Sequence, residues 1–144
     1  MNRTPTTIAA LVLALALSVF AVATIASCAG PRSKSVTLFP AAELAWPAVS
    51  EDFHRGVADG LEDGDLPQPA ADELRSEAEA LGRALDARDV DAVRAVPWPI
   101  MQPWVDRGID DKLLDGEIGP GVAASLREQL AKFTSTIDDI QGIL

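Results

Sequence analysis

The feature that most constrains the fold is an internal repeat with a displacement of 52 residues. When the chain is shifted against itself by that distance, two segments align without a gap. The clearest matches are Trp46-Pro47 with Trp98-Pro99, Arg55-Gly56-Val57 with Arg107-Gly108-Ile109, and Asp63-Gly64-Asp65-Leu66 with Asp115-Gly116-Glu117-Ile118. A period near 50 is typical of a duplicated supersecondary unit. Two copies are too few for a solenoid, so we expect them to pack on each other.

Apolar residues in each copy recur at spacings of three and four, which places them on one face of a helix. In the first copy they are Trp46, Val49, Phe53, Val57 and Leu61, followed by Leu66, Ala70, Leu74, Leu81 and Leu85. In the second they are Trp98, Met101, Val105, Ile109 and Leu113, followed by Ile118, Val122, Leu126, Leu130, Phe133 and Ile137. Each copy therefore predicts a helix, a short loop and a second helix.

Proline, glycine and aspartate mark the expected helix ends. Pro47 suits a first helical turn, where its missing N–H is not needed. Gly64 is suited to the left-handed conformation that ends a helix. Pro103 would remove a hydrogen bond inside a helix, so we expect the regular helix of the second copy to start later. Between the copies, Asp89 is a candidate cap for a short helix with Val93 facing inward.

The predicted fold is all-α, with two tandem helix-loop-helix repeats packed as a four-helix bundle after an N-terminal signal helix. The repeats span residues 44–87 and 98–144, joined by a linker over 88–97. The expected repeat core is Trp46, Phe53, Leu74, Trp98, Leu126 and Phe133. We interpret the repeated tryptophans as core residues rather than as a ligand-binding site.

The N-terminal segment has the three parts of a secretory signal. Arg3 precedes an uncharged apolar run that begins at Ile8, and small residues lead to Cys28, the only cysteine. A run of about 19 residues could also cross a bilayer uncleaved, and a secreted product is a further alternative. Gly30 and Pro31, which break helices, favour cleavage over a continuous membrane helix.

Ile25, Ala26, Ser27 and Cys28 together resemble the lipobox of bacterial lipoproteins. The resemblance implies that residues 1–27 are removed and that Cys28 carries a diacylglycerol and an amide-linked acyl chain, which would anchor it in a membrane. Residues 28–43 would then be the lipidated cysteine and a flexible tether. The same resemblance, with Ala29 directly after the cysteine, implies that the protein is anchored in the outer membrane of a cell envelope and faces the periplasm.

The charge of the chain excludes some partners. It carries 22 acidic and 12 basic side chains, for a formal net charge of −10. Nucleic-acid binding needs a basic face, so no nucleic acid is expected. Anionic lipid would also repel the chain, so the acyl chains on Cys28 must supply membrane attachment. With that cysteine lipidated, no disulfide can form within the chain.

The two loops share some positions with a calcium-binding EF-hand loop. Asp59, Asp63, Gly64 and Leu66 match its first, fifth, sixth and eighth positions, and Asp111, Asp115, Gly116 and Ile118 match them again. Leu61 and Leu113 occupy the third position, and Ala70 and Val122 occupy that of the bidentate glutamate, so several oxygen ligands are missing. We therefore expect no metal site, and a helix end followed by an aliphatic residue between two helices.

The residues of an enzyme site are also missing from the sequence. His54, the only histidine, cannot form a paired-histidine metal site, and we expect it to be partly exposed near acidic side chains. No nucleophile elbow or phosphate-binding glycine loop occurs. The abundant carboxylates, including Glu77 and Glu79, are expected on solvated helix faces. We predict no enzymatic activity and no cofactor.

The leading hypothesis is a lipid-anchored, non-enzymatic envelope lipoprotein that acts in protein–protein interaction or structure, with an unknown protein partner. One alternative is a phage lysis lipoprotein, because size and signal resemble the outer-membrane spanin subunit. A neighbouring endolysin and holin gene would favour that alternative. An unrecognised periplasmic hydrolase is the third.

Overall fold

The computed structural model describes residues 32–143, which form helices and turns with no strand in that range. The helices are α2 (Arg32–Glu62), α3 (Gln68–Ala87), α4 (Val90–Arg94), α5 (Trp98–Leu114) and α6 (Pro120–Gln141). Residues Leu38–Leu144 make up one compact unit, and the helices pack together around a shared core. The prediction of an all-α fold is therefore confirmed for residues 32–143.

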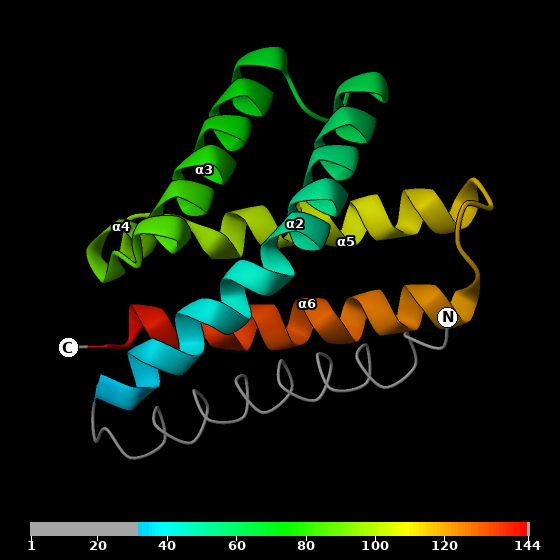
Figure 1. The fold of residues 1–144 in the computed structure, drawn as a ribbon. Coiled ribbons are helices and arrows are strands. Elements are labelled where there is room, and N and C mark those ends of the chain that lie inside the picture. The colour runs from blue at the N-terminus through cyan, green and yellow to red at the C-terminus, as the bar shows by residue number, and fades with distance from the viewer. Residues whose placement is uncertain (1–31, 144) are drawn as a thin grey trace, which may run out of the picture. The chain divides into compact units, whose positions relative to one another are not determined.

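Each of the helices α2 and α5 is followed by a helix that runs back beside it (Figure 1). Short turns join α2 to α3 and α5 to α6, and α4 connects the two pairs. The short helix α4 contacts both α3 and α6. The side-chain amide of Gln141 donates to the carbonyl oxygens of Val93 and Val96 at 3.1 and 3.3 Å, which ties this connection to the end of α6.

The core contains aromatic and aliphatic side chains from all five described helices. Of the six expected core residues, Phe53, Leu74, Trp98 and Phe133 are buried, whereas Trp46 and Leu126 are partly buried. The Phe133 ring centre lies 5.8 Å from that of Trp46 and 5.0 Å from that of Trp98. Trp98 also donates its Nε1–H to the Thr134 hydroxyl at 3.0 Å. Both tryptophans therefore contribute to packing.

Two predictions of side-chain direction are wrong. Val122 was expected to face inward but is 52% exposed. The residue that is buried at the start of α6 is its neighbour Ala123. Glu77 was expected on a solvated face but is partly buried, since it lies beside Leu74 in a groove described below. Glu79 is exposed as predicted.

The prediction of a flexible tether over residues 28–43 is wrong for its described part. Helix α2 already begins at Arg32, and Phe39 and Ala42 are each only 1% exposed. Their spacing continues the apolar face of Val49 and Phe53 toward the N-terminus. Burying a phenylalanine stabilises the folded state by about 1.5–3 kcal/mol, which favours an extended first helix. Residues 28–31 of the predicted tether lie outside the described residues.

The proline-based helix starts are also wrong. Pro40 and Pro47 both lie inside α2, and Pro103 lies inside α5, which begins at Trp98. Each internal proline removes one backbone hydrogen bond and crowds the preceding turn. Helix α2 bends part-way along its length (Figure 1), as expected for a helix with internal prolines. Burial of the apolar faces on both sides of these prolines outweighs the local cost.

The predicted helix ends and linker helix are confirmed. Gly64 and Gly116 adopt φ angles of +77° and +74°, the left-handed conformation expected where a helix ends. The Asp89 side chain accepts a hydrogen bond from the Ala92 N–H at 3.0 Å and so caps α4. Val93 is fully buried.

Candidate functional site

Helices α2 and α5 cross at two glycines. A Cβ atom added to Gly56 would lie 1.8 Å from the carbonyl oxygen of Trp104, and one added to Gly108 would lie 1.8 Å from that of Asp52. Real Cβ atoms essentially never approach another heavy atom within 3.0 Å. Glycine, which has no Cβ, permits this close approach of two backbones. The repeated Arg-Gly pair of the sequence therefore places a glycine from each helix at the crossing.

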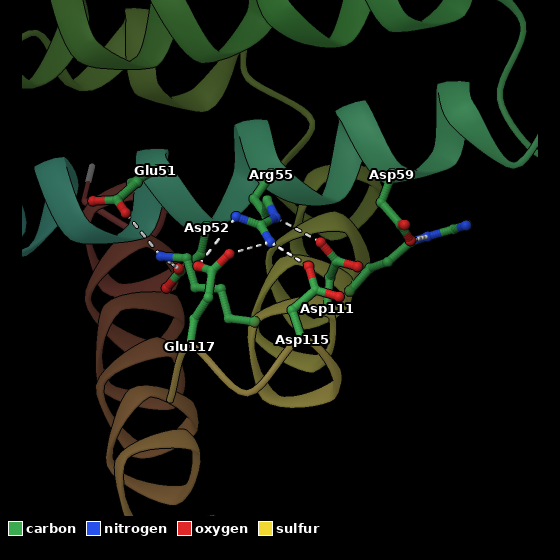
Figure 2. Close-up of polar contacts among 9 residues, drawn as sticks. Glu51, Asp52, Arg55, Asp59, Asp111, Asp115 and Glu117 are labelled. Atoms are coloured by element: carbon green, nitrogen blue, oxygen red, sulfur yellow. Dashed lines mark hydrogen bonds and ion pairs between the residues drawn. The ribbon is translucent and has the colours of Figure 1, made fainter. Parts of the chain in front are cut away.

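Beside this crossing, Arg55 of α2 extends toward three carboxylates at the end of α5 (Figure 2). Its Nε donates to Asp111 Oδ2 at 2.5 Å, and its Nη2 donates to Asp115 Oδ2 at 2.8 Å and Glu117 Oε1 at 2.7 Å. The Arg55 side chain is 29% exposed, so the cluster is only partly screened by water. The hydrogen bonds that Arg55 donates to Glu117 and Asp111 raise the pKa of Arg55 above its already high value.

Arg107 of α5 extends in the opposite direction, toward three carboxylates at the end of α2. Its Nε donates to Asp59 Oδ2 at 2.8 Å, and its Nη2 donates to Asp63 and Asp65 at 3.1 and 2.9 Å. The Arg107 side chain is 25% exposed. Hydrogen bonds to Asp59 and Asp65 raise the pKa of Arg107 above its ordinary value.

The two arginine clusters use positions that the sequence repeat aligns. Asp59, Asp63 and Asp65 align with Asp111, Asp115 and Glu117 at the displacement of 52, and Arg55 aligns with Arg107. Each arginine binds the carboxylates of the other segment rather than those of its own. The acidic loop residues that resemble part of an EF-hand are therefore bound to guanidinium groups. Among residues 38–143, no group of three or more His, Cys, Asp or Glu side chains is arranged to hold a metal ion.

A buried carboxylate lies beside the crossing on α2. Asp52 is 4% exposed, and its Oδ1 lies 2.7 Å from the Lys112 ammonium nitrogen, which also contacts Glu51 at 2.8 Å. The Asp52 contact lacks the angle of a hydrogen bond, so we treat it as an ion pair. Burial disfavours the charge on Lys112, but contacts with Asp52 and Glu51 outweigh it and raise the pKa of Lys112.

The repeat is broken at this point. Trp104 occupies the position aligned with Asp52, and Gly60 occupies the position aligned with Lys112. On this side the Trp104 ring lies so close to Gly60 that an added Cβ would meet ring carbon Cζ3 at 2.6 Å. The Arg107 guanidinium lies over the same ring, 5.6 Å from its centre, which is a cation–π contact. An ion pair on one side thus corresponds to an indole on the other.

Trp104 also lines an open groove of about 350 Å³ between α3 and the start of α5. We call it the α3–α5 groove; its lining residues are Leu66, Ala70, Glu73, Leu74, Glu77, Pro97, Ile100 and Trp104. Leu66 and Leu74 are nearly buried, at 7% and 8% exposed, whereas Ile100 is 63% exposed. Its size is within the range of ligand-binding pockets.

His54 lies on the exposed side of α2, with its ring 5.4 Å from that of Phe53 in an edge-on contact. The surrounding protein disfavours its charged form, and nearby Arg75 adds to this effect, so the pKa of His54 is lowered; Glu79 partly opposes the change. Asp106 occupies the aligned position, and burial raises the pKa of its carboxyl group. His54 thus has one acidic neighbour, as expected, but also a basic one.

The predicted signal and lipidation residues Ile25, Ala26, Ser27 and Cys28 lie outside the described residues. None of the helices described in residues 32–143 is long and apolar enough to cross a membrane.

Comparisons of the chain with protein-family models, curated proteins and solved structures found no match.

Proposed function

We propose that the protein is a lipid-anchored, non-enzymatic lipoprotein of a bacterial envelope, acting in protein–protein interaction or structure. The observation that carries the anchor is the sequence Ile25-Ala26-Ser27-Cys28 at the end of an uncharged apolar run. Lipid on Cys28 would hold the domain at a membrane surface. The proposed location is the outer membrane, with the domain facing the periplasm. Two or more acyl chains are needed for stable attachment, and lipoprotein modification supplies them.

We further propose that the domain consists of two equivalent helical hairpins related by a pseudo-twofold axis at the Gly56–Gly108 crossing, forming a four-helix bundle. The reciprocal arginine clusters support this arrangement, since each arginine contacts the acidic loop that follows the other arginine's helix. The tryptophans add support. Trp98 donates to Thr134, and the Trp46 Nε1 lies next to Gly82, the position aligned with Thr134.

The use of charged residues favours a scaffold over a catalyst. The repeated arginines and acidic residues are bound to one another across the α2–α5 crossing, where they stabilise the packing of the two segments. Networks of this kind are worth more than isolated surface ion pairs. Several large apolar side chains, in contrast, are exposed on the surface: Leu44 86%, Ile100 63%, Leu114 84% and Val122 52%. Such side chains are available for contact with another protein.

Metabolic labelling tests the anchor. When the protein is expressed in a Gram-negative host, we expect it in the membrane fraction with incorporated labelled palmitate, and Cys28→Ala should abolish the label. A mature N-terminus other than Cys28, or labelling that persists in the variant, would contradict the lipoprotein assignment.

Photo-cross-linking tests the interaction role. A photoreactive amino acid placed in turn at Leu44, Ile100, Leu114 and Val122 should give a discrete protein adduct from at least one position. The absence of adducts from all four would refute the interaction role, whatever the outcome of the labelling.

A further inference from the structure

The α3–α5 groove has an apolar surface that is open to solvent. Leu66 and Leu74 form part of its lining from one side, and Ile100 and Trp104 contribute from the other. Ile100 is mostly exposed even though it is one of the larger aliphatic residues of the chain. Covering this groove would remove apolar surface from water, which is the main favourable contribution to most protein associations.

Two glutamates on the groove have no cationic partner within residues 38–143. Glu73 and Glu77 lie one helical turn apart on α3, both line the groove, and neither forms an ion pair in that range. Every lysine and arginine between residues 38 and 143, in contrast, is ion-paired with another carboxylate. A cationic group of a bound molecule would therefore find both carboxylates free of competing ion pairs within residues 38–143.

The groove also departs from the sequence repeat. The positions aligned with Glu73 and Glu77 are Ser125 and Gln129, and those aligned with Ile100 and Trp104 are Ala48 and Asp52. Glu73, Glu77, Ile100 and Trp104 thus have no similar residue at the aligned positions, whereas the lining residues Leu66 and Leu74 align with Ile118 and Leu126. Since Ser125 and Gln129 carry no charge, the repeat does not account for the acidic side of the groove.

We propose that the α3–α5 groove binds a cationic amphipathic helix of a protein partner. The inference rests on the proposed interaction role and adds the chemistry of the partner. Helices that bind grooves insert apolar residues from one face. Lysine or arginine side chains one turn apart on the flank of that face would meet Glu73 and Glu77. A second copy of this chain, with its net charge of −10, would be repelled electrostatically.

A peptide-binding measurement tests the groove directly. The protein is isolated from the membranes of the expressing host and placed in nanodiscs of phosphatidylcholine, with empty nanodiscs as the baseline. The probe is a fluorescent helical peptide of about 18 residues with leucines on one face and lysines flanking them one turn apart. A matched peptide has glutamate in place of every lysine. Anisotropy should show binding of the lysine peptide above the baseline and at least tenfold weaker binding of the glutamate peptide.

Variants localise the binding. Glu73→Gln/Glu77→Gln should weaken binding of the lysine peptide about fivefold, and less so in high salt, because the ion pairs are partly exposed. Ile100→Ser should also weaken it. The control Asp138→Asn/Asp139→Asn removes the same charge from the exposed surface of α6 and should leave binding unchanged.

Three results would overturn the inference. They are no binding of the lysine peptide above empty nanodiscs, binding by Glu73→Gln/Glu77→Gln as tight as by the parent protein, or a loss in the Asp138→Asn/Asp139→Asn control as large as in that variant. Adducts from Leu44, Leu114 or Val122 would still leave the proposed interaction role in place. The peptide-binding measurement can therefore refute the groove proposal while the photo-cross-linking still supports the interaction role.

Discussion

Replacing Gly56 with alanine tests the closest contact of the domain. Its added Cβ would lie 1.8 Å from the Trp104 carbonyl oxygen and 2.9 Å from the Gly108 nitrogen. Both of these are backbone atoms, so no side-chain rotation can relieve the overlap. Helices α2 and α5 would have to separate by about 1 Å at the crossing to restore an allowed contact.

That separation has a cost that can be estimated. Overpacking a well-packed site typically costs about 1–3 kcal/mol, and we expect Gly56→Ala at or above the upper end because the obstructing atoms are backbone. The arginine clusters would also be stretched, since each spans the two helices that move apart. Such a loss is a large share of the roughly 5–15 kcal/mol by which domains are stable.

Urea unfolding of residues 29–144, followed by far-ultraviolet circular dichroism, measures this cost. Gly121→Ala is the matched control, because an added Cβ there meets nothing within 4 Å. Gly121 lies in α6, so alanine should raise stability by about 0.4–1 kcal/mol. The double variant Gly56→Ala/Gly108→Ala should cost less than the sum of the single changes, because one separation accommodates both methyl groups. A Gly56→Ala variant as stable as the Gly121→Ala control would refute the close crossing.

Three further predictions concern side chains away from the crossing glycines. Arg107→Gln should cost about 1 kcal/mol, because it removes the cation from an ion-pair network in which Asp63 and Asp65 are more than half exposed. The difference from the parent protein should shrink in high salt, and a loss that is insensitive to salt would contradict the electrostatic account. Leu74→Ala should cost about 2–5 kcal/mol in the same unfolding assay. Leu126→Ala should cost less, because that side chain is only partly buried. Equal costs would contradict the difference in burial. The folded state lowers the pKa of His54, so the unfolded chain binds the proton more tightly, and His54 should reduce stability as pH falls through about 6.5. His54→Gln should therefore lose less stability than the parent protein between about pH 7 and pH 5.5, and identical pH profiles would exclude the effect.

Much of the secondary structure could be predicted because it depends on local signals. Apolar spacing from Leu66 to Leu85 and from Ile118 to Ile137 predicts helices where α3 and α6 lie, and Gly64 and Gly116 mark the ends of the helices before them. The start of α2 could not be predicted in the same way. Pro47 favours a first helical turn by its local preference, whereas packing of Phe39 and Ala42 against the core determines where the helix begins.

The candidate site was harder to predict because its contacts are distant in sequence. Arg55 binds carboxylates that lie 56 to 62 residues away. Helical spacing shows which side chains share a face but not which element lies opposite. The available signal was the repeat itself, since it retains an arginine, a glycine and three acidic positions that an apolar core does not explain. Recurrence of a charge was not sufficient by itself, because Arg75 and Arg127 also align but each pairs with a carboxylate of its own copy.

The reciprocity of these contacts has a consequence for assembly. In an isologous dimer interface, residue i of one subunit contacts residue j of the other, and residue j of the first contacts residue i of the second. Here Arg55 with Asp111 and Arg107 with Asp59 have that form within a single chain. The covalent connection through α4 makes their association intramolecular, at an effective concentration that dilution cannot change. A weak interface is then sufficient, and the pairing should be independent of protein concentration.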